Sequence, residues 1–274
     1  MATPTPSDPV APASVSAAMR LPDFAAPNGW QASITKEITR VEGFGAWRVA
    51  PASQVRADRA KYGEARVSIG YIVAVLTCKN DPAGNPREPE VVNKFRVAVA
   101  DKADATSGVV THSKTVDDVS NRVISAVSRA IGAKQDSIDV GGAYFHGRPL
   151  AMRFGGRRLY VRIPGWLAAL FPDRYPLRGA HGANCLLIEG NMPGRCDAGR
   201  IWQQRFDEFL TGFGLTQLLT DRRVWIKHSA AGRLILHDHV DDTRITATSD
   251  AVREEFHAAW AATFKEKIVL RPLS

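Results

Sequence analysis

Apolar residues recur at intervals of three and four along four stretches of the chain, which is the spacing of an amphipathic helix. The clearest stretch follows Thr115 and has two aspartates in its first turn, where acidic side chains favour a helix. One face of this stretch carries Val116, Val119, Val123, Val127 and Ala130 or Ile131. The pattern predicts helices over residues 30–42, 116–131, 201–213 and 251–267.

Short β-branched and apolar segments bounded by turn residues predict strands in the rest of the chain. Residues 79–90 are rich in Pro, Asn and Glu and would form a long polar loop within a hairpin. Only one strand is predicted in residues 148–200, which are rich in Gly, Pro and Arg. The predicted strands cover residues 67–77, 94–100, 137–140, 158–163, 223–228, 233–240 and 243–248. This order of elements predicts an α+β fold in which helices back an antiparallel sheet.

Composition and charge narrow the class of protein. The 274 residues suffice for one large domain or two smaller ones. Lys and Arg outnumber Asp and Glu by 36 to 28, and the net charge of +8 favours a polyanionic partner. The longest apolar run, residues 69–76, is far shorter than the roughly 20 residues that cross a bilayer, so no membrane association is expected. Residues 1–28 are rich in Pro and Ala and are predicted to be a disordered leader.

The cysteines and histidines do not suggest a metal or nucleophilic site. Cys78, Cys185 and Cys196 are odd in number and far apart, without zinc-ligand spacing, which indicates a reduced intracellular protein, cytoplasmic or nuclear. No base partner for Cys196 can be identified. The histidines of interest also lack metal-ligand spacing and are interpreted as packing or polar residues: His146, His237 and His239.

Three aspartates are the candidates for chemistry. Asp241 and Asp242 stand between two predicted strands, so a hairpin turn would present both carboxylates. Asp139 ends a short apolar strand and precedes two glycines, which permit a turn or a close approach of the backbone. Two hard cations that hold a triphosphate and a sugar hydroxyl require several oxygen ligands of this kind. The alternative is that these aspartates serve only as turn residues, where Asp is common.

Five motifs, in order along the chain, resemble those of copia-type retrotransposon reverse transcriptases. The string DVGGAYFHG at residues 139–147 resembles the first catalytic motif, Asp-Val-x-x-Ala-aromatic with a trailing His-Gly. HVDD at residues 239–242 resembles the Tyr-x-Asp-Asp turn. Three further segments are similar to family motifs. The segment upstream of the fingers strands corresponds to residues 30–51, and a basic fingers strand corresponds to residues 94–97. The Ala-Pro-Arg-x-Trp motif before a palm helix corresponds to residues 198–202. Agreement of several weak motifs in order is more specific than any one of them.

The resemblance implies a fingers-and-palm fold and an RNA-directed DNA polymerase activity. Fingers would occupy about residues 29–132 and the palm about residues 133–274. Mg²⁺, or Mn²⁺ in its place, would be bound by carboxylates and one backbone carbonyl in a two-metal phosphoryl transfer. The implied ligands are Asp139, Asp241, Asp242 and the carbonyl of Val140.

The resemblance also implies contacts to deoxynucleoside triphosphates, in addition to an RNA template and a DNA primer. Ala143 and Tyr144 would lie against the incoming nucleotide, with Tyr144 crowding a ribose 2′-hydroxyl. Lys94 and Arg96 alternate with apolar residues on one strand and would reach the triphosphate. The alternatives are that Tyr144 packs in the core and that the two cations line a solvated strand face.

Two positions depart from the family pattern. His239 stands where the family has Tyr, and Asp197 stands where the family has the Gln that contacts the nucleotide. A negative charge at Asp197 should weaken triphosphate binding. The chain also ends soon after Asp242, so thumb and ribonuclease H are expected to be absent. Two alternatives therefore stay open: a non-catalytic basic module that binds nucleic acid, and an inactive fragment of such an element.

Overall fold

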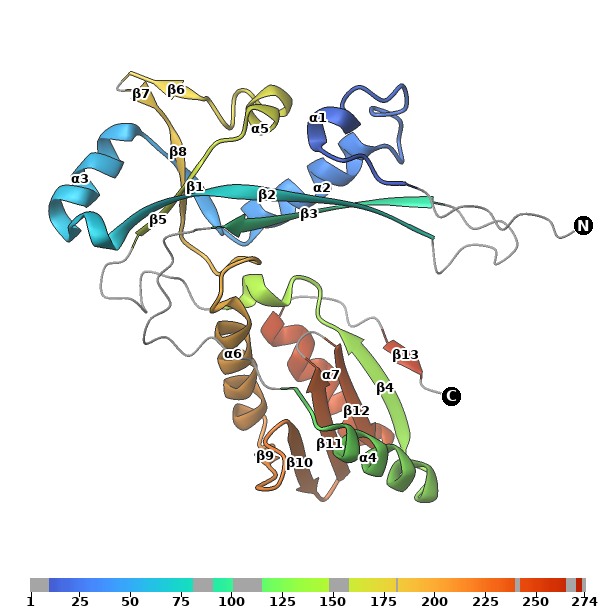
Figure 1. Cartoon of the computed structure of the whole chain (residues 1–274). Coiled ribbons are helices and arrows are strands. Elements are labelled where there is room, and N and C mark those ends of the chain that lie inside the picture. Colours follow the sequence, from blue (N-terminus) through green and yellow to red (C-terminus); the bar gives the residue numbers. More distant parts are fainter. Residues whose placement is uncertain are drawn as a thin grey trace, which may run out of the picture. The chain divides into compact units, whose positions relative to one another are not determined.

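The computed structural model describes residues 10–80, 91–100, 115–147, 158–180, 182–239, 242–264 and 270–272. It is an α+β protein, as predicted, and it forms two compact units (Figure 1). Each unit is discontinuous in sequence. The first comprises Met1–Ala105 with Pro149–Arg195, and the second comprises Thr106–Arg148 with Cys196–Ser274. In the described part of the chain no helix is long and apolar enough to cross a membrane.

The first unit contains a five-stranded sheet in the order β1-β8-β5-β2-β3. Its pairs are antiparallel except for β2 and β5, which run parallel. The strands are β1 Trp47–Ala50, β2 Val67–Asn80, β3 Val91–Ala100, β5 Arg158–Arg162 and β8 Cys185–Ile188, with a separate pair β6 Arg178–Gly179 and β7 Gly182–Ala183. The helical segments are α1 Val15–Ala18, α2 Trp30–Gly43, α3 Ala52–Tyr62, η1 Glu64–Arg66 and α5 Gly165–Leu170.

The long hairpin of β2 and β3 confirms the two strands predicted on either side of the polar loop (Figure 1). Phe95, Val97 and Val99 are buried, and the residues between them are more exposed, so β3 alternates as its sequence predicted. Helix α2 is linked to β3 at the outer edge of the sheet, where the backbone N–H of Phe95 donates to the hydroxyl of Ser33 at 2.9 Å.

The second unit contains a six-stranded antiparallel sheet in the order β13-β4-β12-β11-β10-β9. The strands are β4 Lys134–Asp139, β9 Thr216–Gln217, β10 Val224–Ser229, β11 Gly232–His239, β12 Asp242–Ala247 and β13 Leu270–Pro272. The helical segments are α4 Asp118–Ala130, η2 Ala143–His146, α6 Ala198–Gly212 and α7 Asp250–Phe264. The predicted strands around the Asp-Asp doublet and the two predicted C-terminal helices are confirmed.

Helices α6 and α7 close the core of the second unit over one face of its sheet. Their aromatic side chains stack and pack edge to face, with ring centroids 5.4 Å apart for the stacked Trp202 and Phe206 and 5.6 Å apart for the edge-to-face Phe206 and Trp260. These rings cover apolar residues of the central strands, which include Leu236 of β11. Large rings bury much apolar area each, so this cluster provides most of the hydrophobic stabilisation of the unit.

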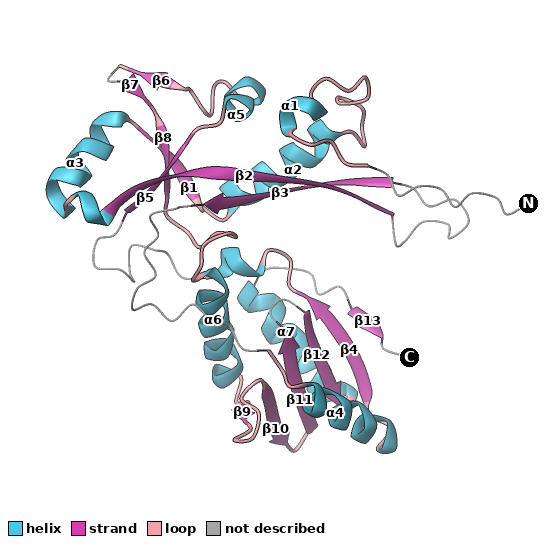
Figure 2. Ribbon diagram, viewed as in Figure 1, coloured by secondary structure: helices cyan, strands magenta, loops and turns pink. Residues whose placement is uncertain are grey.

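Helix α4 is formed as predicted and lies on the opposite face of the sheet from α7 (Figure 2). The apolar residues of its predicted stripe are exposed. The side that meets the sheet carries Ile124 and Ser128, both buried. The hydroxyl of Ser128 donates to the carbonyl of Ile124 at 2.6 Å and lies 3.1 Å from that of Thr246 on β12. Because the sheet presents polar groups here, a polar side of α4 packs against it.

Segments of the two units alternate along the sequence, whereas a single boundary between fingers and palm was predicted near residue 132. Helix α4, expected with the fingers, belongs to the second unit because it packs on β12. Residues 158–188, expected with the palm, belong to the first unit because β5 and β8 pair with β2 and β1. Strand β8, CLLI, is buried along its whole length, although the sequence analysis did not predict it.

Candidate active site

The ends of three neighbouring strands in the second unit carry the predicted catalytic motifs. Strand β4 ends at Asp139 and strand β12 begins at Asp242, and the antiparallel register makes these two residues Cα partners. On the other side of β12, His239 at the end of β11 is also a Cα partner of Asp242. The Cα atoms of such partners lie about 4.5–5.5 Å apart. Two acids that are far apart in the sequence are therefore neighbours in the sheet.

Asp241, the other member of the doublet, lies with Val240 outside the described residues. The strands that these two residues join are described, and they pair from Leu234 with Ala247 to His239 with Asp242. Asp242 is therefore the first residue of β12, whereas the sequence placed it with Asp241 in the turn between the two strands.

The segment after β4 turns at once into the short helix η2. Gly142 adopts a left-handed conformation with φ of 66°, which glycine does without steric cost. The N–H of Ala143 donates to the carbonyl of Val140 at 3.2 Å, which closes the turn. A carbonyl oxygen has two lone pairs, so the oxygen of Val140 retains one for a further ligand.

Of the two residues expected beside a nucleotide, only Tyr144 presents side-chain surface. Ala143 is buried in the core cluster of the second unit, together with Trp202. Tyr144 is half-buried and packs against that cluster. The alternative that Tyr144 packs in the core therefore holds in part, and Ala143 is a core residue.

Lys94 and Arg96 lie on β3 in the first unit, on the strand face that does not carry Phe95. Their Cα partners on β2 are Thr77 and Val75. Arg96 is exposed and Lys94 is half-buried. The predicted shared face of the two cations is confirmed by this alternation.

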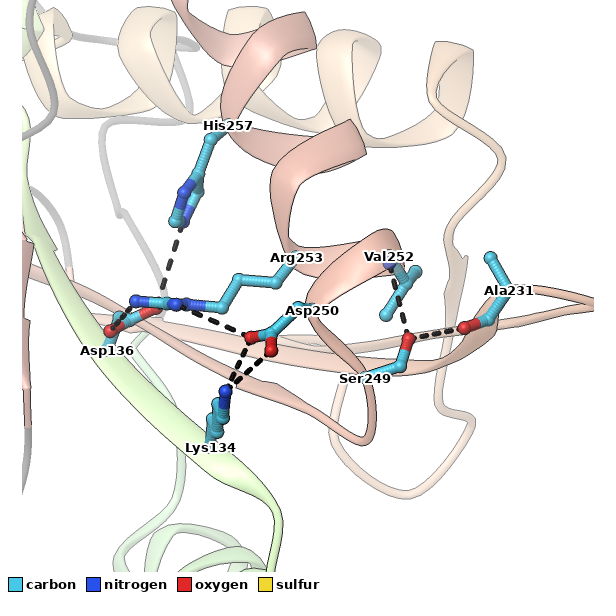
Figure 3. A network of polar contacts seen from close by, with 8 residues as sticks. All are labelled: Lys134, Asp136, Ala231, Ser249, Asp250, Val252, Arg253 and His257. Atoms are coloured by element: carbon cyan, nitrogen blue, oxygen red, sulfur yellow. Dashed lines mark hydrogen bonds and ion pairs between the residues drawn. The ribbon is translucent and has the colours of Figure 1, made fainter.

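A network of ion pairs ties β4 to the beginning of α7, just before Asp139 (Figure 3). Asp136 is buried, and Arg253 of α7 donates to both of its oxygens, with Nη2 at 2.9 Å from Oδ1. Nζ of Lys134 lies 2.7 Å from Asp250 in a second, exposed pair. His257 Nε2 lies 3.8 Å from Asp136, and burial lowers the pKa of this imidazole.

Ser249 caps helix α7 at this network (Figure 3). The N–H of Val252 donates to the Ser249 hydroxyl oxygen at 3.3 Å, and this hydroxyl donates to the carbonyl of Ala231 in the turn between β10 and β11. The beginning of α7 is thus attached both to β4 and to the turn between β10 and β11.

A second buried pair supports β11 just before the doublet. Nη1 of Arg223 lies 2.8 Å from Asp207 of α6, and Nη2 donates to Asp238 of β11. Burial raises the pKa of Asp238 to about 6, and the charge of Arg223 only partly offsets this effect. The carbonyl of Asp238 accepts the N–H of Val116 at 3.2 Å, so the residues that precede α4 are attached to the same strand.

The buried acids Asp136 and Asp238 were not predicted from the sequence, although the strand pattern contains a signal for their burial. Asp238 has the same period-two position on β11 as the buried Leu234 and Leu236, and Asp136 has that of the buried Ile138 on β4. A charged residue at a core position of a strand indicates a buried partner. No comparable signal identifies the partners Arg223 and Arg253.

Three other residues of interest take structural positions. The ring of His146 lies edge-on to Phe264, with centroids 5.3 Å apart, which confirms its packing role. His237 is buried with Nε2 at 3.0 Å from the side-chain oxygen of Asn121, which confirms a polar role. Asp197 is buried at the start of α6, where a carboxylate interacts favourably with the helix dipole.

Comparisons with known proteins give no assignment for this site. A scan against models of protein families found no match, and a search of curated proteins also found none.

Proposed function

We propose that this protein is the fingers-and-palm core of a copia-type retrotransposon reverse transcriptase, which adds deoxynucleotides to a DNA primer on an RNA template. The observation that carries the proposal is the register that makes Asp139 and Asp242 Cα partners. Each belongs to one of the two motifs that resemble the catalytic motifs of this family. Their pairing supports a single acidic site built from both.

The groups gathered at these strand ends suit a hard divalent cation. Carboxylates and a backbone carbonyl are the oxygen ligands that Mg²⁺ accepts, and Mn²⁺ accepts the same set. Asp139 and Asp241 would be the main ligands, with Asp242 adding negative charge beside them and the carbonyl of Val140 supplying a further oxygen. Bound Mg²⁺ would lower the pKa of a primer 3′-hydroxyl and stabilise the charge of the leaving pyrophosphate.

The remaining predicted residues would bind the substrate. The exposed guanidinium of Arg96 and the ammonium of Lys94 would pair with the triphosphate, because charge-assisted hydrogen bonds to phosphate are strong. The exposed part of Tyr144 would contact the sugar and disfavour a ribose 2′-hydroxyl.

Primer extension with the full chain on poly(rA)/oligo(dT) tests the proposal. We expect incorporation by the wild type in Mg²⁺ or Mn²⁺ and loss to background in Asp241→Asn, which keeps the shape of the side chain and removes its charge. Asp173→Asn, at an exposed position of the first unit, is the matched control and should retain wild-type activity.

Metal binding is measured separately from activity. Addition of Mg²⁺ should raise the midpoint of thermal unfolding of the wild type but not of the Asp139→Asn, Asp242→Asn double variant, because a ligand stabilises the folded state that binds it. Background incorporation by all proteins, together with no effect of Mg²⁺ on unfolding, would refute the proposal. Salt-sensitive binding of the template-primer with that result would instead favour the non-catalytic module.

A further inference from the structure

Helix α4 carries an apolar stripe on its solvent side. Val119, Val123, Val127 and Ile131 are 68%, 54%, 44% and 54% exposed, and they follow one another at intervals of four residues. Side chains at this interval form a ridge on a helix surface. An amphipathic helix normally turns such a ridge to the core, whereas α4 packs on its own sheet through Ile124 and Ser128.

The surroundings of the stripe favour a protein partner. The exposed Ala126 and Ala130 lie beside the valines and leave room for close approach of another helix. Asp118, Arg122 and Arg129 are exposed along one border, so the border carries both signs of charge. Aliphatic side chains provide no ring on which a base stacks, and an acidic residue repels phosphate, which argues against nucleic acid here.

We propose that this stripe is a homodimer interface in which the α4 helices of two copies pack antiparallel about a two-fold axis at Val123. This axis sets Val119 of one copy against Val127 of the second copy, and Val123 against its own counterpart. A two-fold contact needs a self-complementary surface, and a ridge of equally spaced valines satisfies that condition by packing into the grooves of its counterpart.

Charge decides the direction of the two helices. In the antiparallel arrangement Asp118 of each copy lies beside Arg129 of the other, so the two-fold axis creates two pairs of opposite charge. A parallel two-fold arrangement would place the charged borders of the two copies on opposite sides of the contact, so Asp118 and Arg129 would not form these pairs. The unequal distribution of charge along the border therefore selects the antiparallel dimer.

The interface is small, so association should be weak. Helix α4 has 13 residues and is therefore about 20 Å long. One helix from each copy buries less area than a standard stable interface, and we expect a dissociation constant on the order of 10 μM. This proposal is independent of the polymerase proposal, because no predicted catalytic residue lies on α4.

Sedimentation equilibrium of the full chain tests the dimer. The wild type should show twice the mass of one chain at high concentration, and Val123→Asp should raise the dissociation constant at least tenfold by placing two carboxylates on the axis. Val92→Asp, the same change at a valine of the first unit that is 45% exposed, is the matched control and should dimerise normally. A wild type that stays monomeric, or equal dimerisation of Val123→Asp and wild type, would overturn the proposal.

Cross-linking tests the direction and the position of the axis. In a Cys196→Ser background, which removes the exposed thiol, Val123→Cys should cross-link to itself with a short bismaleimide. Val119→Cys should not cross-link to itself but should cross-link to Val127→Cys when the two differently tagged variants are mixed. Self-cross-linking of Val119→Cys with none between the mixed variants would indicate a parallel contact and overturn the proposal.

Discussion

The ion pair between Arg253 and Asp136 provides the sharpest test of how the candidate site is supported. The perturbation is Arg253→Met, which keeps an aliphatic chain over the sheet and removes the guanidinium. Asp136 is only 2% exposed and would lose a partner that donates to both of its oxygens. His257 Nε2 would remain 3.8 Å away, but burial lowers the pKa of this imidazole and disfavours its charged form.

The expected loss in the free energy of unfolding follows from the burial of Asp136. Removal of one partner from a buried pair costs about 3–5 kcal/mol, because the remaining charge is neither hydrated nor paired. The Arg253 side chain is 23% exposed, so water can reach part of the space that it leaves. We therefore expect a loss near the lower limit, about 3 kcal/mol in the free energy of unfolding.

Urea denaturation followed by circular dichroism measures this loss. Lys134→Met is the matched control in the same network, because its pair with Asp250 is 58% and 55% exposed and water replaces the lost contact. Asp136→Asn combined with Arg253→Met should recover part of the loss, since a neutral amide needs no cation. Equal losses for Arg253→Met and Lys134→Met, or no recovery in the double variant, would refute the reasoning.

Three further predictions concern the core, the buried acid and a turn. Phe256→Ala removes a fully buried ring from the α6–α7 cluster and should lower the free energy of unfolding in urea by about 3–5 kcal/mol. Burial holds the folded-state pKa of Asp238 at about 6, above its unfolded value, so its contribution to stability should fall as the pH rises from about 4 to about 6. Asp238→Asn should remove that slope from urea unfolding measured across this range. Gly194→Ala should lower the midpoint of thermal unfolding, at a cost of about 1–3 kcal/mol, because φ is 88° there and the added Cβ would overlap the carbonyl oxygen of Val99.

Local pattern was sufficient to predict most of the elements that carry the site. The period of α4, the alternation of β3 and the short strands on either side of the Asp-Asp doublet were all predicted from the sequence. These predictions succeed because they depend on residues that are close in the chain, where spacing alone decides which side chains share a face. The elements missed include strand β8, in a stretch rich in Gly, Pro and Arg, and helix α3. The prediction of a disordered leader over residues 1–28 was wrong for helix α1, whose Val15 and Ala18 are buried.

The pairing of Asp139 with Asp242, in contrast, could not be predicted from the local sequence pattern. The sequence showed only that each ends or begins a strand, and the resemblance suggested that they belong together. Their pairing requires β4 to lie beside β12 in one particular antiparallel register. Register depends on contacts across the whole sheet, so no local pattern determines it.

The sequence by itself therefore determined that this chain alternates helices and strands, carries excess positive charge and contains three aspartates in a suggestive order. Only the tertiary structure decided that Asp139 and Asp242 are Cα partners and that Arg253 pairs with Asp136. It also decided that α4 turns its valines to solvent. The reason is physical. An amphipathic pattern predicts that a helix has an apolar face, but which face is buried depends on the polar groups of the sheet against which the helix packs. On the buried face of α4, Ser128 contacts Thr246 and Asn121 contacts His237.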